Sequence, residues 1–198
     1  MIDPIEDAVR AALDGGLIVV PTDTVYGIGT RPDDARATAR LFEVKGRPRD
    51  LELPVLVPNA AAAREITVFD ERAEILAGRW WPGPLTLVLP RAEPSRAWDL
   101  GGDPTTVGVR VPHHPMALAV LARTGPLAVS SANRSGHTTA ADCDGLARVF
   151  GDAVDVYLCQ EAKLAGSAST VVDLAHGEWR VLRPGAVTEQ EIRTLLRA

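Results

Sequence analysis

The sequence predicts a single α/β domain with a mixed sheet, and three observations support this prediction. Of the 198 residues, 46% are hydrophobic and 24% are charged, which is the composition of a globular domain able to bury a full core. Short apolar runs alternate along the chain with stretches of helical periodicity. We find no internal repeat and no long polar linker, so residues 1–198 are expected to form one domain.

The first predicted element is an N-terminal helix. Asp3 is a candidate N-cap, and Pro4 suits the first helical position. Ile5 to Leu13 continues the helical pattern, and Gly15-Gly16 supplies a C-terminal stop. We therefore expect one short helix before the first strand.

Strands and helices are then expected to alternate. Leu17 to Val20 is a short apolar run typical of a strand buried on both faces, and Asp34 to Glu43 shows helical spacing, with a loop between them. Further strands are expected at Leu53 to Val57, Leu85 to Leu89, Val107 to Val111, Leu127 to Ser130, Val154 to Leu158, Thr170 to Leu174 and Trp179 to Leu182. Further helices are expected at Asp70 to Trp80, Pro115 to Arg123 and Ala141 to Phe150. Thr188 and Glu191 form a capping box that begins a last helix, which is expected to run to the C-terminus.

Charge and cysteine content restrict the classes of function. With 21 basic and 26 acidic residues the net charge is −5, which argues against wholesale coating of a polyanion but allows a local basic cleft. Two cysteines, Cys143 and Cys159, are too few for a zinc cluster or a disulfide framework; their spacing does not decide whether they are bonded, and a reducing cytosol suits them. The apolar runs are shorter than the roughly 20 residues of a spanning helix, so we expect a soluble cytoplasmic protein without a membrane partner.

Several common active-site motifs are absent. The chain has no P-loop, no complete dinucleotide-binding fingerprint, no H-E-x-x-H and no G-x-S-x-G. The adjacent histidines His113 and His114 point in divergent directions, which favours a role in a loop or at the helix start before Pro115 over metal binding. We therefore expect no protein-bound metal centre.

Two polar segments follow predicted strands, where open α/β sheets place their ligands. Pro21 to Gly27 supplies threonines, an aspartate and a tyrosine on a stiff backbone, although Thr22 and Asp23 could instead satisfy a turn or cap a helix. Ser130 to Gly136 combines small hydroxyls and an amide in a turn that could hold an anion, or could be a simple serine-rich turn. Because no histidine lies at a fixed offset, Ser131 is interpreted as a ligand-holding hydroxyl and not as a nucleophile.

A third segment concentrates positive charge. Lys45 and Arg47 alternate with Gly46 and Pro48, just past a predicted helix end, where cations also complement the helix dipole. The braced turn could project Lys45 as a point charge together with Arg47 as a planar fork, a pairing suited to polyphosphate. Capping and phosphate binding both remain open for this segment.

Taken together, these segments resemble the YrdC/Sua5 family of threonylcarbamoyl-AMP synthases. The resemblance covers nearly the whole chain through motifs that are individually weak but specific in their order and spacing. These motifs are Pro21-Thr22-Asp23-Thr24-Val25-Tyr26-Gly27-Ile28-Gly29, Lys45-Gly46-Arg47-Pro48, Trp81-Pro82-Gly83-Pro84-Leu85-Thr86, Val109-Arg110-Val111-Pro112, Ser131-Ala132-Asn133-Arg134-Ser135-Gly136, Ser169-Thr170-Val171-Val172-Asp173 and Leu182-Arg183-Pro184-Gly185.

The resemblance implies a YrdC-like domain, a twisted mixed sheet flanked by helices around a positively charged cavity. It implies that L-threonine, bicarbonate and ATP, with Mg²⁺ bound mainly by ATP, yield threonylcarbamoyl-AMP and pyrophosphate. This product feeds the t6A modification of tRNA through downstream transfer machinery, so tRNA is an indirect partner. No C-terminal Sua5 extension is expected after Arg183-Pro184-Gly185.

The resemblance also assigns residues. The catalytic tetrad falls on Lys45, Arg47, Ser131 and Asn133, and ATP contacts are expected from these four with Thr139 and Arg183. Threonine is expected to meet Thr24, Arg110 and Ser169, with Tyr26 as a wall of the cavity. The alternation of the strand directs Arg110 away from the face of Val107, Val109 and Val111. A guanidinium fork can hold the substrate carboxylate.

The sequence departs from the family pattern at two positions, and two other functions are considered beside the synthase. Leu51 and Leu56 stand where many members have an asparagine and a histidine, and neither side chain can hydrogen-bond. One alternative is a non-catalytic paralogue with a regulatory or RNA-binding role, including binding of double-stranded RNA; retention of the tetrad favours the enzyme. The other, carbamoyl transfer from carbamoyl phosphate, needs further domains.

Overall fold

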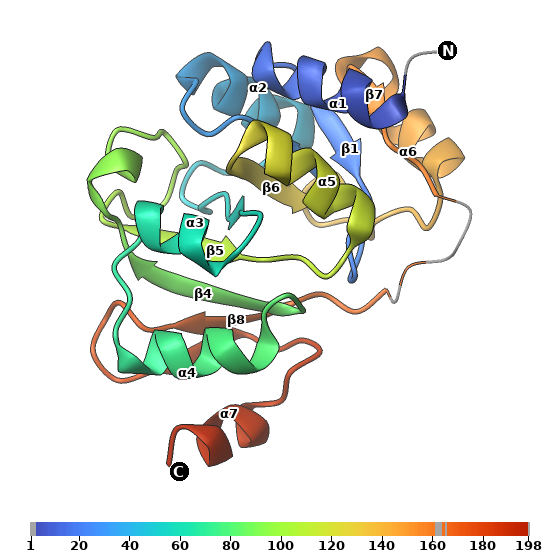
Figure 1. Cartoon of the computed structure of the whole chain (residues 1–198). Helices are drawn as coiled ribbons and strands as arrows, with labels where there is room; N and C mark the ends of the chain where they lie inside the picture. The colour runs from blue at the N-terminus through green and yellow to red at the C-terminus, as the bar shows by residue number, and fades with distance from the viewer. Residues whose placement is uncertain (1–2, 161–163, 165, 198) are drawn as a thin grey trace.

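The protein folds around one nine-stranded mixed sheet (Figure 1). The computed structural model describes residues 3–160, 164 and 166–197. The strand order is β7-β1-β2-β6-β3-β5-β4-β8-β9. The strands are β1 (Ile18–Val20), β2 (Gly27–Thr30), β3 (Val55–Leu56), β4 (Leu85–Pro90), β5 (Thr106–Arg110), β6 (Leu127–Ser131), β7 (Val156–Tyr157), β8 (Thr170–Asp173) and β9 (Arg180–Arg183).

Helices flank the sheet as the amphipathic pattern predicts. They are α1 (Pro4–Leu13), α2 (Ala35–Lys45), α3 (Ala60–Ile66), α4 (Glu71–Trp80), α5 (Pro115–Thr124), α6 (Cys143–Phe150) and α7 (Glu189–Leu195), with short 3₁₀ turns η1 (Glu93–Ser95) and η2 (Gly151–Ala153). Helices α1 and α5 pack against each other, and α4 contacts both β4 and α7. The prediction of a mixed α/β domain is therefore confirmed.

Most expected elements lie where the sequence placed them, with small differences at their ends. Asp3 caps α1 by accepting a hydrogen bond from the backbone of Ile5, and Thr188 and Glu191 form the expected capping box of α7. The last helix ends at Leu195 and does not continue to the C-terminus. Local capping chemistry was sufficient to locate these helix starts.

One strand and one α-helix were missed, besides the two short 3₁₀ turns. The segment expected to be a loop between β1 and α2 contains β2, whose sequence Gly-Ile-Gly-Thr lacks an apolar alternation. A Cβ added to Gly27 or Gly29 would lie 2.5 or 2.6 Å from side-chain carbons of Val129 on β6, so these glycines permit close strand packing. The second missed element is α3, an alanine-rich helix of 7 residues capped by Asn59.

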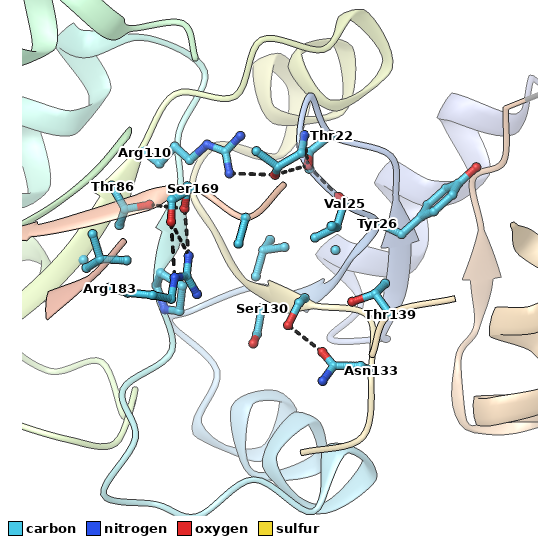
Figure 2. Close-up of a pocket in the computed structure, with 18 of the residues that line it drawn as sticks. Thr22, Val25, Tyr26, Thr86, Arg110, Ser130, Asn133, Thr139, Ser169 and Arg183 are labelled. Carbon is cyan, nitrogen blue, oxygen red and sulfur yellow. Dashed lines mark hydrogen bonds between the residues drawn. The ribbon is translucent and has the colours of Figure 1, made fainter. Parts of the chain in front are cut away.

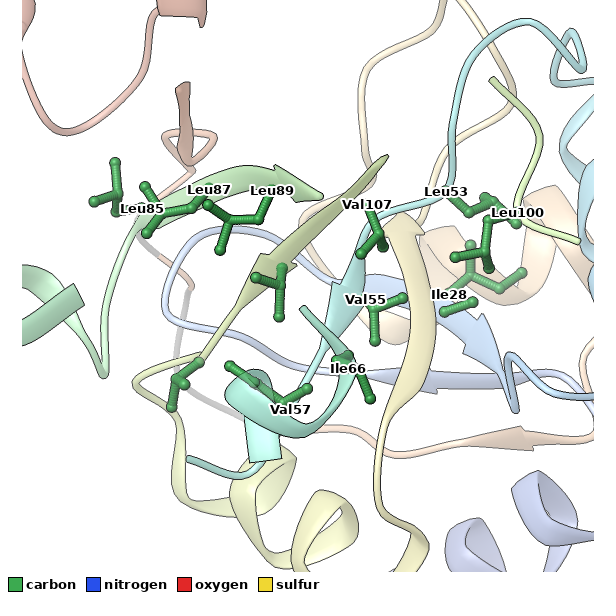
Figure 3. Packing of buried hydrophobic residues seen from close by; sticks show 14 of the residues in the cluster. Ile28, Leu53, Val55, Val57, Ile66, Leu85, Leu87, Leu89, Leu100 and Val107 are labelled. Carbon is green, nitrogen blue, oxygen red and sulfur yellow. The ribbon is translucent and has the colours of Figure 1, made fainter. Parts of the chain in front are cut away.

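Alternation along the central strands separates the core from a polar face. Leu85, Leu87 and Leu89 of β4 belong to the main core, with Val107 and Val109 of β5 (Figure 3). The intervening residues of the same strands point to the other face of the sheet, because successive side chains in a strand alternate. The polar and small residues Thr86, Gly108 and Arg110 therefore come to line a cavity.

The two cysteines are joined in a disulfide. Cys143 and Cys159 are bonded, with their Cα atoms 5.9 Å apart. The sequence left their state open and associated them with a reducing compartment. The structure settles the bonding that the sequence left open: Cys143, at the start of α6, and Cys159, just after β7, are joined across a sequence separation of 16.

Candidate active site

A cavity of about 770 Å³ lies on the polar face of the sheet. Loops after β1 and β6, the turn after α2 and the strands β4, β5, β8 and β9 contribute to its wall. All but one of the sequence-predicted site residues line it: Thr24, Tyr26, Arg47, Arg110, Ser131, Asn133, Thr139, Ser169 and Arg183. The exception is Lys45. Segments that are distant in sequence thus converge on a single site.

Arg110 is held in a fixed orientation at one side of the cavity. Its Nε donates to the carbonyl of Gly83 at 2.9 Å, its Nη1 to Thr24 Oγ1 at 3.0 Å and its Nη2 to Asp23 Oδ1 at 2.5 Å. The backbone N–H of His113 donates to the same Asp23 oxygen at 2.9 Å. Burial lowers the pKa of Arg110, and the charge of Asp23 opposes that shift. The guanidinium is therefore both buried and pre-oriented beside Thr24.

Arg183 and Ser169 form a second polar group in the cavity wall (Figure 2). Arg183 Nη2 donates to the carbonyl and to Oγ of Ser169, at 2.8 and 2.9 Å. Ser169 Oγ lies 3.0 Å from Thr86 Oγ1. Burial lowers the pKa of Arg183. This group connects β4 and β9 through Ser169, the residue just before β8.

The structure separates the two cations that the sequence placed together. Arg47 lines the cavity, and its guanidinium donates to the carbonyls of Leu51 and Glu52 at 3.0 and 2.8 Å. Lys45 is only 2% exposed, and its Nζ donates to the carbonyls of Ser131 and Asn133 at 2.5 and 2.6 Å. Burial, and secondarily the charge of Arg47, lowers the pKa of Lys45 to about 7. The turn therefore projects only Arg47 into the cavity, and Lys45 braces the loop behind it.

The loop after β6 is ordered by its own side chains. Ser131 Oγ donates to Asn133 Oδ1 at 2.5 Å, and Asn133 Nδ2 donates to the carbonyl of His137 at 2.6 Å. Thr139 follows on the same loop and lines the cavity beside them. Together with the ammonium of Lys45, these contacts fix the backbone that presents the hydroxyls and the amide.

Tyr26 connects the first motif to the chain beyond β7. It is 1% exposed, and its hydroxyl accepts from the backbone N–H of Gln160 at 3.2 Å. The ring lines the cavity, as expected of a wall residue.

Sequence reasoning assigned no specific ligand to several lining residues. Thr22 and Thr86 face the cavity, and strand alternation in the segment Leu85 to Pro90 would have indicated Thr86. Glu52 carries the only carboxyl group among the described lining residues, which also include the guanidinium groups of Arg47, Arg110 and Arg183. Burial raises the pKa of Glu52 to about 7, and the nearby Arg91 opposes that shift. No local motif marks this glutamate.

The remaining predicted positions also have defined places. Leu51 and Leu56 both line the cavity, Leu51 at an exposed position and Leu56 at a buried one. His114 Nε2 lies 2.6 Å from Gln160 Oε1.

Across residues 3–160, 164 and 166–197, no group of three or more histidine, cysteine or acidic side chains is arranged to hold a metal ion. No helix in that part of the chain is long and apolar enough to cross a membrane.

Comparison with known proteins decides the family. Residues 10–185 match the Sua5_yciO_yrdC family model, described as telomere recombination. The chain belongs to this family. A relative from Mycobacterium tuberculosis, named "Putative threonylcarbamoyl-AMP synthase", is 43% identical over 193 residues, which span 97% of this chain and 88% of the relative.

Longer family members cover the same region. A Bacillus subtilis threonylcarbamoyl-AMP synthase is 32% identical over 197 residues, which span 98% of this chain and 57% of the relative. The crystal structure of Pyrococcus abyssi Sua5 complexed with L-threonine matches with a TM-score of 0.88 and 33% identity, over 99% of this chain and 58% of that one. The Sua5/YciO/YrdC fold is therefore shared along essentially the whole described chain.

Proposed function

We propose that this chain is an L-threonylcarbamoyladenylate synthase, a nucleotidyltransferase that converts L-threonine, bicarbonate and ATP into threonylcarbamoyl-AMP, pyrophosphate and water. The observation that supports this most directly is the convergence on one cavity of Thr24, Arg110 and Ser169 with Arg47 and Arg183. Three guanidinium groups and one carboxyl among the described lining residues give an excess of positive charge, which suits two anionic substrates. Relatives carrying the synthase name cover nearly the whole chain.

Threonine would bind at the Arg110 side of the cavity. Arg110 already lies against Thr24 and Asp23, so its orientation is set before the substrate carboxylate arrives. A charge-assisted contact to that carboxylate holds the amine in one direction. Ser169 and the hydroxyl of Thr24 are the neighbouring polar groups, and Tyr26 closes the wall.

ATP would occupy the side formed by Arg47, Ser131, Asn133, Thr139 and Arg183. The threonine amine captures carbon dioxide from bicarbonate as a carbamate, and a carbamate oxygen attacks the α-phosphorus. The bond from that phosphorus to the bridging oxygen breaks, and pyrophosphate leaves. The protein aligns the two anions and stabilises the charge that grows on pyrophosphate. Lys45 belongs to this set because its ammonium holds the carbonyls of Ser131 and Asn133.

Magnesium would enter with ATP. Mg²⁺ is usually bound by one or two carboxylates together with substrate phosphates and water. The described cavity wall offers one carboxyl group, Glu52, so the donor set fits an ion held chiefly by the nucleotide. When bound, this ion neutralises phosphate charge during transfer.

The product would serve the t6A modification of tRNA in the cytoplasm. Its acyl phosphate is reactive, so a downstream transfer machinery must accept it, and tRNA is a partner through that machinery. The alternative, a non-catalytic paralogue that binds RNA, has less support because the tetrad is retained and the chain has a net charge of −5.

The proposal is tested by pyrophosphate release from the purified protein with ATP and Mg²⁺. We expect release that requires both L-threonine and bicarbonate, with serine as a control amino acid. Release that is absent, or equal without threonine and bicarbonate, contradicts the proposed function and favours the binding paralogue.

A further inference from the structure

The Cys143–Cys159 disulfide connects two segments at the edge of the cavity. Cys143 is the first residue of α6, and Cys159 follows β7. Residues 137–141, which we call the rim loop, line the cavity immediately before α6. Gln160, immediately after Cys159, contacts the cavity-wall residue Tyr26 through its backbone. The bond therefore links the end of the rim loop to the Tyr26 wall.

The rim loop belongs to the part of the cavity assigned above to ATP. Asn133 Nδ2 holds its first residue through the carbonyl of His137 at 2.6 Å, and Thr139 lies at its centre. Its far end passes into α6, which is capped by Asp142. The position of Thr139 thus depends on the anchoring of both ends of the loop.

The segment around Cys159 is fixed to the body of the protein. Tyr26 OH accepts from the Gln160 N–H at 3.2 Å, and Gln160 Oε1 lies 2.6 Å from His114 Nε2. Helix α6 is attached separately, through Leu146 and Phe150 in the core. The disulfide is a covalent connection between these two attachments. Cys159 is an exposed residue and Cys143 is half-buried, so a small thiol would approach the disulfide from the side of Cys159.

We propose that Cys143 and Cys159 form a thiol–disulfide exchange site that controls the rim loop and thereby the affinity for ATP. The thiolate of a low-molecular-weight dithiol attacks Cys159 Sγ, the disulfide breaks, and Cys143 leaves as a thiolate that takes up a proton. The second thiol of the reagent then displaces Cys159, which gives two protein thiols and the oxidised cyclic reagent. A low-molecular-weight disulfide restores the bond by the reverse exchange.

Reduction of the disulfide is expected to weaken ATP binding, because the rim loop is then no longer held in place in advance. With the disulfide intact, Thr139 is held in place before ATP binds. After reduction, part of the rim loop must be ordered by binding, which weakens ATP binding by about three- to tenfold. The inference rests on the proposed function only in taking ATP as the ligand.

The test compares the oxidised protein, the protein reduced with dithiothreitol and the double variant Cys143→Ser, Cys159→Ser. Free-thiol titration confirms each state, calorimetry at 25 °C measures ATP affinity, and hydrogen exchange measures protection of residues 137–141. We expect the reduced protein and the double variant to share the weaker affinity and faster exchange, and the double variant to be insensitive to dithiothreitol. A bond that serves only global stability would lower the melting temperature without changing ATP affinity at 25 °C.

Two outcomes overturn the inference. One is equal ATP affinity in the oxidised and reduced proteins, and the other is a purified protein whose thiols cannot be oxidised by glutathione disulfide. If instead neither form releases pyrophosphate in response to threonine, the proposed function fails, whereas the hydrogen-exchange comparison of the oxidised and reduced proteins still tests whether the disulfide controls the rim loop.

Discussion

At the scale of single residues, the site depends on buried charges whose partners are already in place. Arg110 makes three hydrogen bonds within the protein, to Gly83, Thr24 and Asp23. Lys45 donates hydrogen bonds to the backbone carbonyls of Ser131 and Asn133. Such contacts reduce the ordering required when an anionic ligand binds. They also mean that a substitution at these positions alters both the structure and the ligand contacts, so binding and stability must be measured together.

The first prediction concerns Arg110→Lys. Lysine keeps the charge but loses the planar fork, so we expect the threonine KM to rise by about tenfold or more, the effect of losing a hydrogen bond to a charged group. The ATP KM should stay within a few fold of that of the parent protein. Arg10→Lys, at an exposed position outside the cavity, is the matched control. A lower melting temperature with an unchanged threonine KM would show that Arg110 serves only as the partner of Asp23.

The second prediction concerns the pH dependence of stability through Glu52. Because its pKa is raised to about 7 by burial, the folded protein holds a proton that the unfolded chain releases near its usual value. Glu52 therefore contributes to the free energy of unfolding, and this contribution is present at low pH and is lost as the pH rises through about 7. From the raised pKa, the loss amounts to about 3 kcal/mol.

Glu52→Gln should remove this pH dependence. Urea unfolding at pH 5 and pH 8 measures the free energy of unfolding of both proteins, and we expect the parent to lose stability relative to the variant between these values. Glu74→Gln is the control, because the exposed Glu74 is paired with Arg64, which lowers its pKa and gives the opposite sign. A parent and variant with parallel pH profiles would contradict a buried, protonated Glu52.

At the scale of elements, strand β2 shows how packing can override sequence pattern. Gly27 and Gly29 allow β2 to lie directly against Val129 of β6. Strand β2 directly follows the Thr22 to Tyr26 segment, so its pairing also helps to position Tyr26 and Thr24.

The third prediction is that Gly29→Ala destabilises the protein by about 1 to 3 kcal/mol, because the new Cβ overpacks against Val129 and the backbone of Ala128. Gly78→Ala is the matched control. Gly78 lies in α4, and an added Cβ there meets nothing within 4 Å, so this change should be neutral or stabilising by up to about 1 kcal/mol. Denaturant unfolding of both variants provides the comparison. Equal effects of the two changes would contradict close packing of β2.

The elements also show what the sequence could and could not predict. Capping residues and apolar runs located α1, α7 and most strands because their signals are local. Strand β2 was missed because glycine there serves a contact with β6, about a hundred residues away. The position of Lys45 behind the cavity and the Cys143–Cys159 bond likewise depend on which loops meet in space.

At the scale of the whole molecule, the site is built from one face of the central strands and the loops around it. The order β6-β3-β5-β4-β8-β9 brings Ser131, Arg110, Ser169 and Arg183 around one cavity although Arg110 and Arg183 are 73 residues apart in the sequence. The motifs predicted nine of the side chains that line the cavity, and strand alternation predicted the direction of Arg110. The sequence could not show that Asp23 pairs with Arg110 or that Glu52 enters the cavity wall.

Clustered arginines in a protein of net charge −5 concentrate positive charge where substrates would bind. The central claim is that this cavity joins bicarbonate, threonine and the adenylyl group of ATP in one product. Its most direct test is incubation with ¹³C-bicarbonate, L-threonine, ATP and Mg²⁺, followed at once by mass spectrometry of the nucleotides. The account predicts an adenylate that contains both threonine and one ¹³C atom, formed in step with pyrophosphate. Pyrophosphate formed without such an adenylate, or an adenylate without the label, would contradict it.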